Sequence, residues 1–381
     1  MPSPLLPLSL YIHIPWCERK CPYCDFNSHA SEQPIDEIAY VDTLLDDLQQ
    51  DLPLAQGRPL ESIFIGGGTP SLFSGEAISR LLQGVSDRIS LTKGCEITME
   101  ANPGSVEAAH FAAYRQAGVN RLSIGVQSFS DDKLQILQRI HSANEATTAL
   151  STARTAGFDN INLDLMFGLP KQTLEQAKMD LLQAIELQPE HISYYQLTIE
   201  PNTRFYLQPP VQPDDELLWS MQEQGQQLLA AAGYQQYEVS AYARKGERCQ
   251  HNLNYWLFGD YLGIGAGAHA KTTQLGEPLQ VTRQSKYSAP SRYLEATDYC
   301  LNRTLLRNED LILEFMMFTL RLVDGFPERL FTARTGVNLK SIERELIALK
   351  DRGLIEYKPP LIRPTALGRQ FLNELIEQFV S

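Results

Sequence analysis

The chain lacks three features that mark large classes of protein. Its apolar runs fall short of the ~20 residues that a membrane-spanning helix needs. The N-terminal Met-Pro-Ser-Pro-Leu-Leu-Pro segment has neither the basic start nor the long apolar stretch of a signal peptide. Positive charge is scarce, because 33 Lys and Arg stand against 46 Asp and Glu, for a formal net charge of −13. General nucleic-acid binding depends on neutralising phosphates with Lys and Arg, so we expect no nucleic-acid partner.

Cysteine is too sparse for a fold held together by disulfides. The 381 residues contain six cysteines, and three of them fall within eight positions. The other three, Cys95, Cys249 and Cys300, are scattered along the chain. This usage is typical of a reducing compartment, so we expect a cytoplasmic protein. The sequence leaves peripheral association with a membrane and formation of a homodimer open.

The three clustered cysteines form a candidate metal site. Cys17, Cys21 and Cys24 have the spacing Cys-x3-Cys-x2-Cys and follow an apolar run, 10–14, that we interpret as a strand. Thiolates suit zinc and iron–sulfur clusters. Zinc sites usually take two pairs of ligands, and the chain has no second Cys-x2-Cys, although His13 or His29 could supply a fourth ligand. A [4Fe–4S] cluster held by three cysteines would keep one iron open. The spacing favours a cluster, and zinc remains the alternative.

The motif and its flanks resemble one superfamily. Tyr23 precedes the last cysteine, and residues 11–15, Tyr-Ile-His-Ile-Pro, lead into the motif. These features resemble radical S-adenosylmethionine (SAM) proteins, in the branch that contains oxygen-independent coproporphyrinogen III dehydrogenase and the HemW-type haem chaperones. The resemblance implies that Cys17, Cys21 and Cys24 hold a [4Fe–4S] cluster whose open iron binds SAM. It also places Tyr11 and Tyr23 at the SAM site.

Short apolar segments alternate with helical patterns up to about residue 235, which is typical of repeated βα units. We predict strands at 10–14, 60–65, 95–101, 120–126, 160–167 and 191–197, and helices at 36–52 and 214–232. Six units fit a doubly wound sheet or a partial barrel, and the resemblance favours the barrel. The predicted fold class is therefore α/β, a partial (β/α)6 TIM-like barrel with a small C-terminal winged-helix-like domain. In barrels the chemistry lies at the carboxyl ends of the strands.

Polar residues stand at these predicted strand ends. Residues 66–70, Gly-Gly-Gly-Thr-Pro, follow the second strand, and their N–H groups could bind the polar end of a ligand. A carboxylate within an apolar strand is unfavourable unless it is paired or faces water, so structural ion pairs are the alternative to a binding role. By position, the resemblance assigns a SAM pocket to seven residues: Gly67, Gly68, Thr69, Glu100, Gln127, Arg139 and Asp164. No catalytic residue is assigned.

A second candidate site follows three basic residues within 244–248. An imidazole can ligate haem iron, and His251 and Tyr255 lie on one side of either a helix or a strand. A lone histidine beside aromatic residues is more often structural. The pattern HNxxYW, formed by His251, Tyr255 and Trp256, resembles the element associated with haem in HemW-type proteins. Cys249 is a weak candidate for a second ligand, and we expect His269 to be structural.

We divide the chain into a radical SAM core at 1–235, a connecting segment with the haem element at 236–304, and a C-terminal domain at 305–381. In the C-terminal domain we predict helices at 308–322, 337–349 and 366–379, and we interpret the unit as a lid or docking domain. The resemblance implies a haem chaperone that binds haem and transfers it to an unknown acceptor protein. The alternative is oxygen-independent coproporphyrinogen III dehydrogenase. That enzyme carries a further cysteine two residues after the third, where this chain has Phe26, so we favour the chaperone.

Overall fold

The structure is a computed structural model that describes residues 6–31, 33–104, 108–276 and 278–380. Residues 1–5, which include most of the segment that we predicted not to be a signal peptide, lie outside the described residues. Within the described ranges, no helix is both long enough and apolar enough to cross a membrane.

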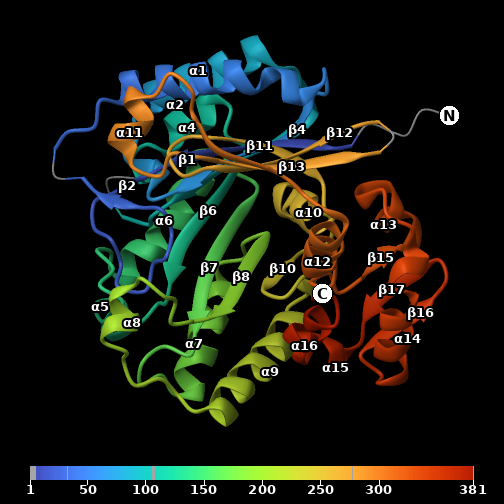
Figure 1. Cartoon of the computed structure of the whole chain (residues 1–381). Coiled ribbons are helices and arrows are strands. Elements are labelled where there is room, and N and C mark those ends of the chain that lie inside the picture. The colour runs from blue at the N-terminus through green and yellow to red at the C-terminus, as the bar shows by residue number, and fades with distance from the viewer. Residues whose placement is uncertain (1–5, 32, 105–107, 277, 381) are drawn as a thin grey trace.

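A twelve-stranded sheet forms the main body of the molecule (Figure 1). Its centre is a run of parallel strands in the spatial order β11, β1, β4, β5, β6, β7 and β8. Their bounds are β1 Leu8–Ile14, β4 Leu60–Gly67, β5 Leu91–Ala101, β6 Arg121–Gln127, β7 Ile161–Phe167, β8 His191–Gln196 and β11 Asp260–Ile264. The six predicted strands are confirmed, and the curved parallel sheet confirms the partial-barrel prediction. We did not predict β11, which lies beside β1 although nearly 250 residues follow β1 before it.

Alternation along each strand separates a packed face from a polar face. On β1 the side chains of Leu8, Leu10 and Ile12 are fully buried under the outer helices. Ser9 and the next alternate residues turn to the concave face, where the Ser9 hydroxyl hydrogen-bonds Ser62 of β4 at 2.8 Å. Successive side chains of a strand point to opposite faces, so this pattern leaves the concave face available for polar and ligand-binding groups.

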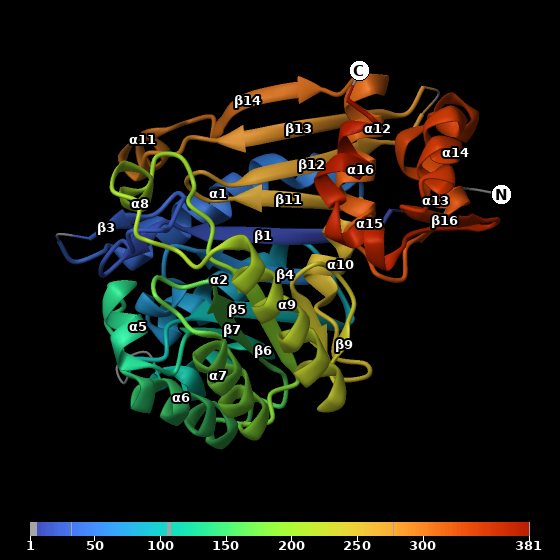
Figure 2. The same cartoon turned by 90° about the horizontal axis from the view of Figure 1, so that it is seen from below.

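Helices cover the convex face of the parallel sheet (Figures 1 and 2). They are α1 Glu37–Ala55, α2 Gly75–Arg88, α4 Phe111–Ala117, α6 Ala143–Thr155, α7 Leu174–Glu186 and α9 Asp215–Ala231. The predicted helices at 36–52 and 214–232 correspond to α1 and α9. Asp36 begins α1 because its side chain accepts a hydrogen bond from the backbone N–H of Ala39.

The segment predicted as a connector adds strands to both ends of the sheet. β12 (His269–Gln274), β13 (Gln280–Lys286) and β14 (Cys300–Leu305) extend it antiparallel beyond β11. At the other end β10 (Ala241–Ala243) and β9 (Gln235–Gln236) follow β8. Between them α10 (Gln250–Trp256) lies against β4, β1 and β11. Residues 236–304 thus share one sheet with the core. The division of the chain into three parts remains a prediction.

The C-terminal part has an apolar core of its own. It contains α12 Asn308–Thr319, α13 Glu328–Thr335, α14 Glu343–Asp351, α15 Ala366–Gln370 and α16 Leu372–Glu377, with a small sheet of β15 Phe326–Pro327, β17 Leu361–Pro364 and β16 Ile355–Lys358. This helix and wing arrangement fits the winged-helix-like prediction. The predicted helix at 366–379 is divided, because the chain departs from helical geometry at Phe371.

Candidate functional site

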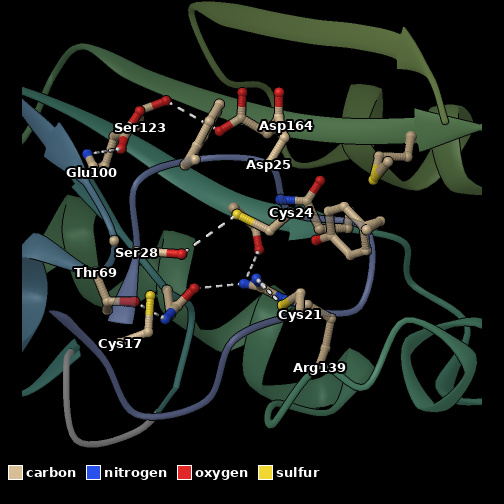
Figure 3. A pocket seen from close by; sticks show the side chains of 18 of the residues that line it. Cys17, Cys21, Cys24, Asp25, Ser28, Thr69, Glu100, Ser123, Arg139 and Asp164 are labelled. Atoms are coloured by element: carbon tan, nitrogen blue, oxygen red, sulfur yellow. Dashed lines mark hydrogen bonds between the residues drawn. The ribbon is translucent and has the colours of Figure 1, made fainter. Parts of the chain in front are cut away.

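A cavity of about 440 Å³ opens at the carboxyl ends of the parallel strands (Figure 3). Its walls come from the cysteine loop after β1 and from the ends of β4 to β8. It brings together the predicted residues Cys17, Cys21, Tyr23, Cys24, Gly67, Gly68, Thr69, Glu100, Gln127, Arg139 and Asp164. Tyr11 does not line the cavity. Its hydroxyl lies 3.0 Å from His13 Nδ1, further back on the concave face of β1. Residues more than 100 positions apart therefore share one site.

Each cysteine of the loop has a polar neighbour. The Cys21 sulfur accepts a hydrogen bond from Arg139 Nη1 at 3.6 Å, and the Cys24 sulfur lies 3.8 Å from Ser28 Oγ. Burial raises the pKa of Cys17, while hydrogen bonds from Thr69 and Ser28 oppose that rise. Donors placed at thiol sulfurs stabilise the thiolate form, which is the form that binds metal.

The two histidines near the loop are engaged elsewhere. His13 lies 2.8 Å from the backbone oxygen of Asn27 through Nε2, and its Nδ1 meets Tyr11. His29 lies 3.3 Å from Asn27 Oδ1. Among the described residues, no three His, Cys, Asp or Glu side chains are placed to hold a single metal ion.

The glycine turn after β4 serves close packing. Gly67 has a φ of +122°, and a Cβ on Gly68 would lie 2.5 Å from the backbone oxygen of Trp16. The N–H of Gly67 donates to Glu100 Oε2, and the N–H groups of Gly68 and Thr69 donate to backbone oxygens at the start of the cysteine loop. Our expectation of free N–H groups for a ligand is therefore wrong. The turn instead fixes the cysteine loop against β4.

Two carboxylates occupy the inner part of the cavity. Burial and the neighbouring charge of Asp164 raise the pKa of Glu100 to about 8. Burial also raises the pKa of Asp164, against hydrogen bonds from Asn162, Ser193 and Ser123. Neither carboxylate forms a salt bridge within the described part of the chain, so the alternative of structural ion pairs does not hold. Arg121 is near enough to lower the pKa of Asp164 but forms no salt bridge with it in the described residues, so the buried acidic pair is suited to binding a positively charged ligand.

Our sequence reasoning missed Asn102 and Tyr195, which also line the cavity. The Tyr195 hydroxyl donates to Gln127 Oε1 at 2.7 Å, and Asn102 contacts both Thr69 and Arg139. Asn102 directly follows β5, so its position at a strand end was the available signal. Tyr195 lies within a strand, and no local pattern marks it.

Comparison with known proteins places the chain in a family. The Radical SAM superfamily model matches residues 11–183, and the HemN C-terminal domain model matches residues 306–371. The chain is 52% identical over 382 residues to the heme chaperone HemW of Haemophilus influenzae, covering 99% of both chains. It is also 52% identical over 386 residues to HemW of Escherichia coli, with the same coverage. The chain belongs to the HemW family.

A solved structure supports the fold. The chain superposes with a TM-score of 0.82 on coproporphyrinogen III oxidase (HemN) from Escherichia coli, described as a radical SAM enzyme, at 24% identity. The match covers 99% of this chain and 90% of that one. HemW of Bacillus subtilis is 34% identical over 388 residues, covering 98% of this chain and 99% of the relative. The radical SAM fold predicted from the cysteine motif is thus confirmed for residues 11–183, and the whole chain shares the fold of that structure.

The HNxxYW element of this HemW-family chain lies outside the cavity. It forms α10, and its His251 ring is 1% exposed, with Nδ1 3.0 Å from Ser62 Oγ and Nε2 3.0 Å from the Tyr255 hydroxyl. Burial, and secondarily the charge of Arg121, lowers the pKa of His251 to about 3. The imidazole is therefore neutral and fully hydrogen-bonded. Trp256 turns toward the C-terminal domain, where Arg321 lies 4.4 Å above its ring.

Glu96 of β5 fixes the start of α10. Its carboxylate accepts hydrogen bonds from the backbone N–H groups of Gln250 and His251 at 3.1 Å, and from the Cys249 sulfur at 3.4 Å. Cys249 is fully buried by these contacts. The structure therefore offers the weakly proposed Cys249 no open route to a haem. His269 is exposed at the start of β12, and its structural role stays a prediction.

Proposed function

We propose that this chain binds haem and transfers it to an acceptor protein. The observation that carries this proposal is its 52% identity, over nearly the full length, to two heme chaperones. Phe26 supports it, because a phenylalanine, 58% exposed at the mouth of the cavity, stands where the coproporphyrinogen dehydrogenase pattern has a further cysteine.

We further propose that Cys17, Cys21 and Cys24 hold a [4Fe–4S] cluster and that SAM binds beside it. The fit is chemical: three thiols line one cavity with hydrogen-bond donors at their sulfurs, and Arg139 Nε is buried there without a partner in the described structure. When bound, the cluster supplies an open iron and an electron for SAM cleavage. The protein's part is to hold the thiolates, to exclude water, and to place Glu100 and Asp164 near the positive charges of SAM.

SAM affinity is expected to rise with pH. With a pKa of about 8, Glu100 is mostly protonated at pH 7 and must lose that proton to pair with the cationic ligand. Below this pKa, each pH unit is therefore expected to change the affinity by up to about tenfold. SAM also titrates, so the measurement is the difference between the parent protein and Glu100→Gln in calorimetric titrations from pH 6.5 to 9. Parallel pH profiles for the two proteins would contradict the assignment of Glu100.

Haem binding is expected to depend on His251, although α10 must move to release it. His251→Ala should weaken haem binding by about tenfold or more, which corresponds to about 1.4 kcal/mol. Tyr255→Phe keeps the aromatic ring but removes the hydroxyl beside Nε2, so it should speed the onset of haem binding. The measurement is a stopped-flow haem titration, with His269→Ala as the control for loss of an exposed imidazole. Unchanged affinity in a folded His251→Ala protein would remove this residue from the haem site.

The experiment that tests the proposal is anaerobic cluster reconstitution followed by two parallel assays. One titrates haem, and the other offers coproporphyrinogen III with SAM and a reductant. Haem binding without decarboxylation supports the chaperone.

A further inference from the structure

Arg139 reaches the cavity wall in an unusual position. Its Nη1 donates to the Cys21 sulfur at 3.6 Å, while its Nη2 donates to the backbone oxygen of Gly125 at 2.9 Å and to Asn102 Oδ1 (Figure 3). The guanidinium thus has one edge on a thiol and its other nitrogen fixed by two acceptors. Binding a ligand in the cavity does not by itself account for a hydrogen bond from Arg139 to a cysteine sulfur.

Asn102 connects this arginine to the opposite wall of the site. Its amide Nδ2 donates to Thr69 Oγ1 at 3.3 Å, and its backbone N–H donates to Ser71 Oγ at 3.3 Å. Thr69 in turn lies beside the Cys17 thiol and lowers its pKa. One side chain, at the end of β5, therefore orients donors toward two of the three cysteines.

We infer that Asn102 is a positioning residue that holds Arg139 against Cys21, and that this contact sets the reduction potential of the cluster. The inference rests on the proposed function only in that the three cysteines must hold a cluster. It differs from the SAM-binding role that the resemblance implies for Arg139. It requires no SAM.

The physical basis is the charge of the reduced cluster. Reduction by an external one-electron donor adds one negative charge to the cluster and its thiolates. A hydrogen bond to a ligating sulfur and a nearby buried cation both stabilise that extra charge, so they raise the reduction potential. The effect is large in a partly water-excluded cavity, because charges interact more strongly at low dielectric constant.

A second cation of the same cavity provides the matched control. Arg19 also lines the cavity but is exposed. Its side chain makes no hydrogen bond to any other described residue, in contrast to that of Arg139. Arg19→Gln removes the same formal charge as Arg139→Gln without removing a contact to sulfur. Comparing the two variants therefore separates the effect of a positive charge at the cavity mouth on the reduction potential from the effect of the hydrogen bond to the Cys21 sulfur.

The test is a potentiometric titration of the reconstituted protein with dithionite, followed by electron paramagnetic resonance of the reduced cluster, without SAM. Iron and sulfide content is measured first for each protein. Arg139→Gln should move the midpoint potential clearly to more negative values. Asn102→Ala should move it in the same direction by a smaller amount, and Arg19→Gln should stay near the parent.

Two results would overturn the inference. In one, Asn102→Ala and Arg139→Gln assemble a full cluster with the parent's potential. In the other, neither variant assembles a cluster, which would make the pair necessary for assembly instead of tuning. If the parent itself assembles no cluster, the proposed cluster fails, and that outcome is recognised from the iron content alone.

Discussion

Replacing Cys21 with serine is expected to leave the purified protein without its iron–sulfur cluster. A serine hydroxyl is a poor ligand for iron in a site built for thiolates, and Cys21 is the cysteine whose sulfur contacts Arg139. After anaerobic reconstitution, iron content should fall from about four atoms per chain to near zero, together with the visible absorption of the cluster.

Cys300→Ser is the matched control for this experiment. Cys300 lies on β14, outside the cavity, and its thiol donates to the backbone oxygen of Asn302 at 3.3 Å. It should retain the parent's iron content. If Cys21→Ser and Cys300→Ser bound the same amount of iron, the cavity would not be the metal centre.

Replacing Asp260 with alanine is expected to destabilise the protein by about 3–5 kcal/mol, because it leaves buried cations without a partner. Asp260 is fully buried at the start of β11, with Arg58 at 2.7 Å and Lys271 at 2.8 Å. It also accepts hydrogen bonds from the backbone and the hydroxyl of Thr273. Burial alone would raise the pKa of Asp260, but Lys271 and Arg58 overcome this and lower it. The carboxylate thus joins β11 and β12 to the turn before β4.

The measurement is the free energy of unfolding from urea titrations. Asp42→Ala is the control, because it breaks an ion pair with Arg80 whose two side chains are 49% and 53% exposed. Exposed pairs contribute only about 0–1 kcal/mol. Equal effects of the two substitutions would show that Asp260 does not hold the extended sheet in place.

The parallel strands were predictable because each is a short apolar run followed by a helix. β11 was not, because its sequence, Asp260–Ile264, merges into a glycine-rich stretch that resembles a loop. The glycines have a structural reason: a Cβ on Gly263 would lie 1.9 Å from the backbone oxygen of His269, and one on Gly265 would lie 2.3 Å from that of His13. Such contacts between distant segments leave no local signal.

Within the site, residues at strand ends were predictable and residues inside the barrel were not. Cys17 and Glu100 could be placed because the ends of parallel strands meet at one edge. The burial of His251 could not, because it depends on Ser62 and Phe64, nearly 190 residues earlier in the chain. The sequence pattern identified a candidate haem ligand but gave no indication that hydrogen bonds occupy both of its nitrogens.

The most direct test of the central claim uses one preparation of the reconstituted protein with SAM and a reductant. Haem is added to one half of it and coproporphyrinogen III to the other. The chaperone account predicts that haem is bound and passed to an added haem-free acceptor such as apomyoglobin, while coproporphyrinogen III is recovered unchanged. Formation of protoporphyrinogen, with loss of two carboxyl groups as carbon dioxide, would contradict it.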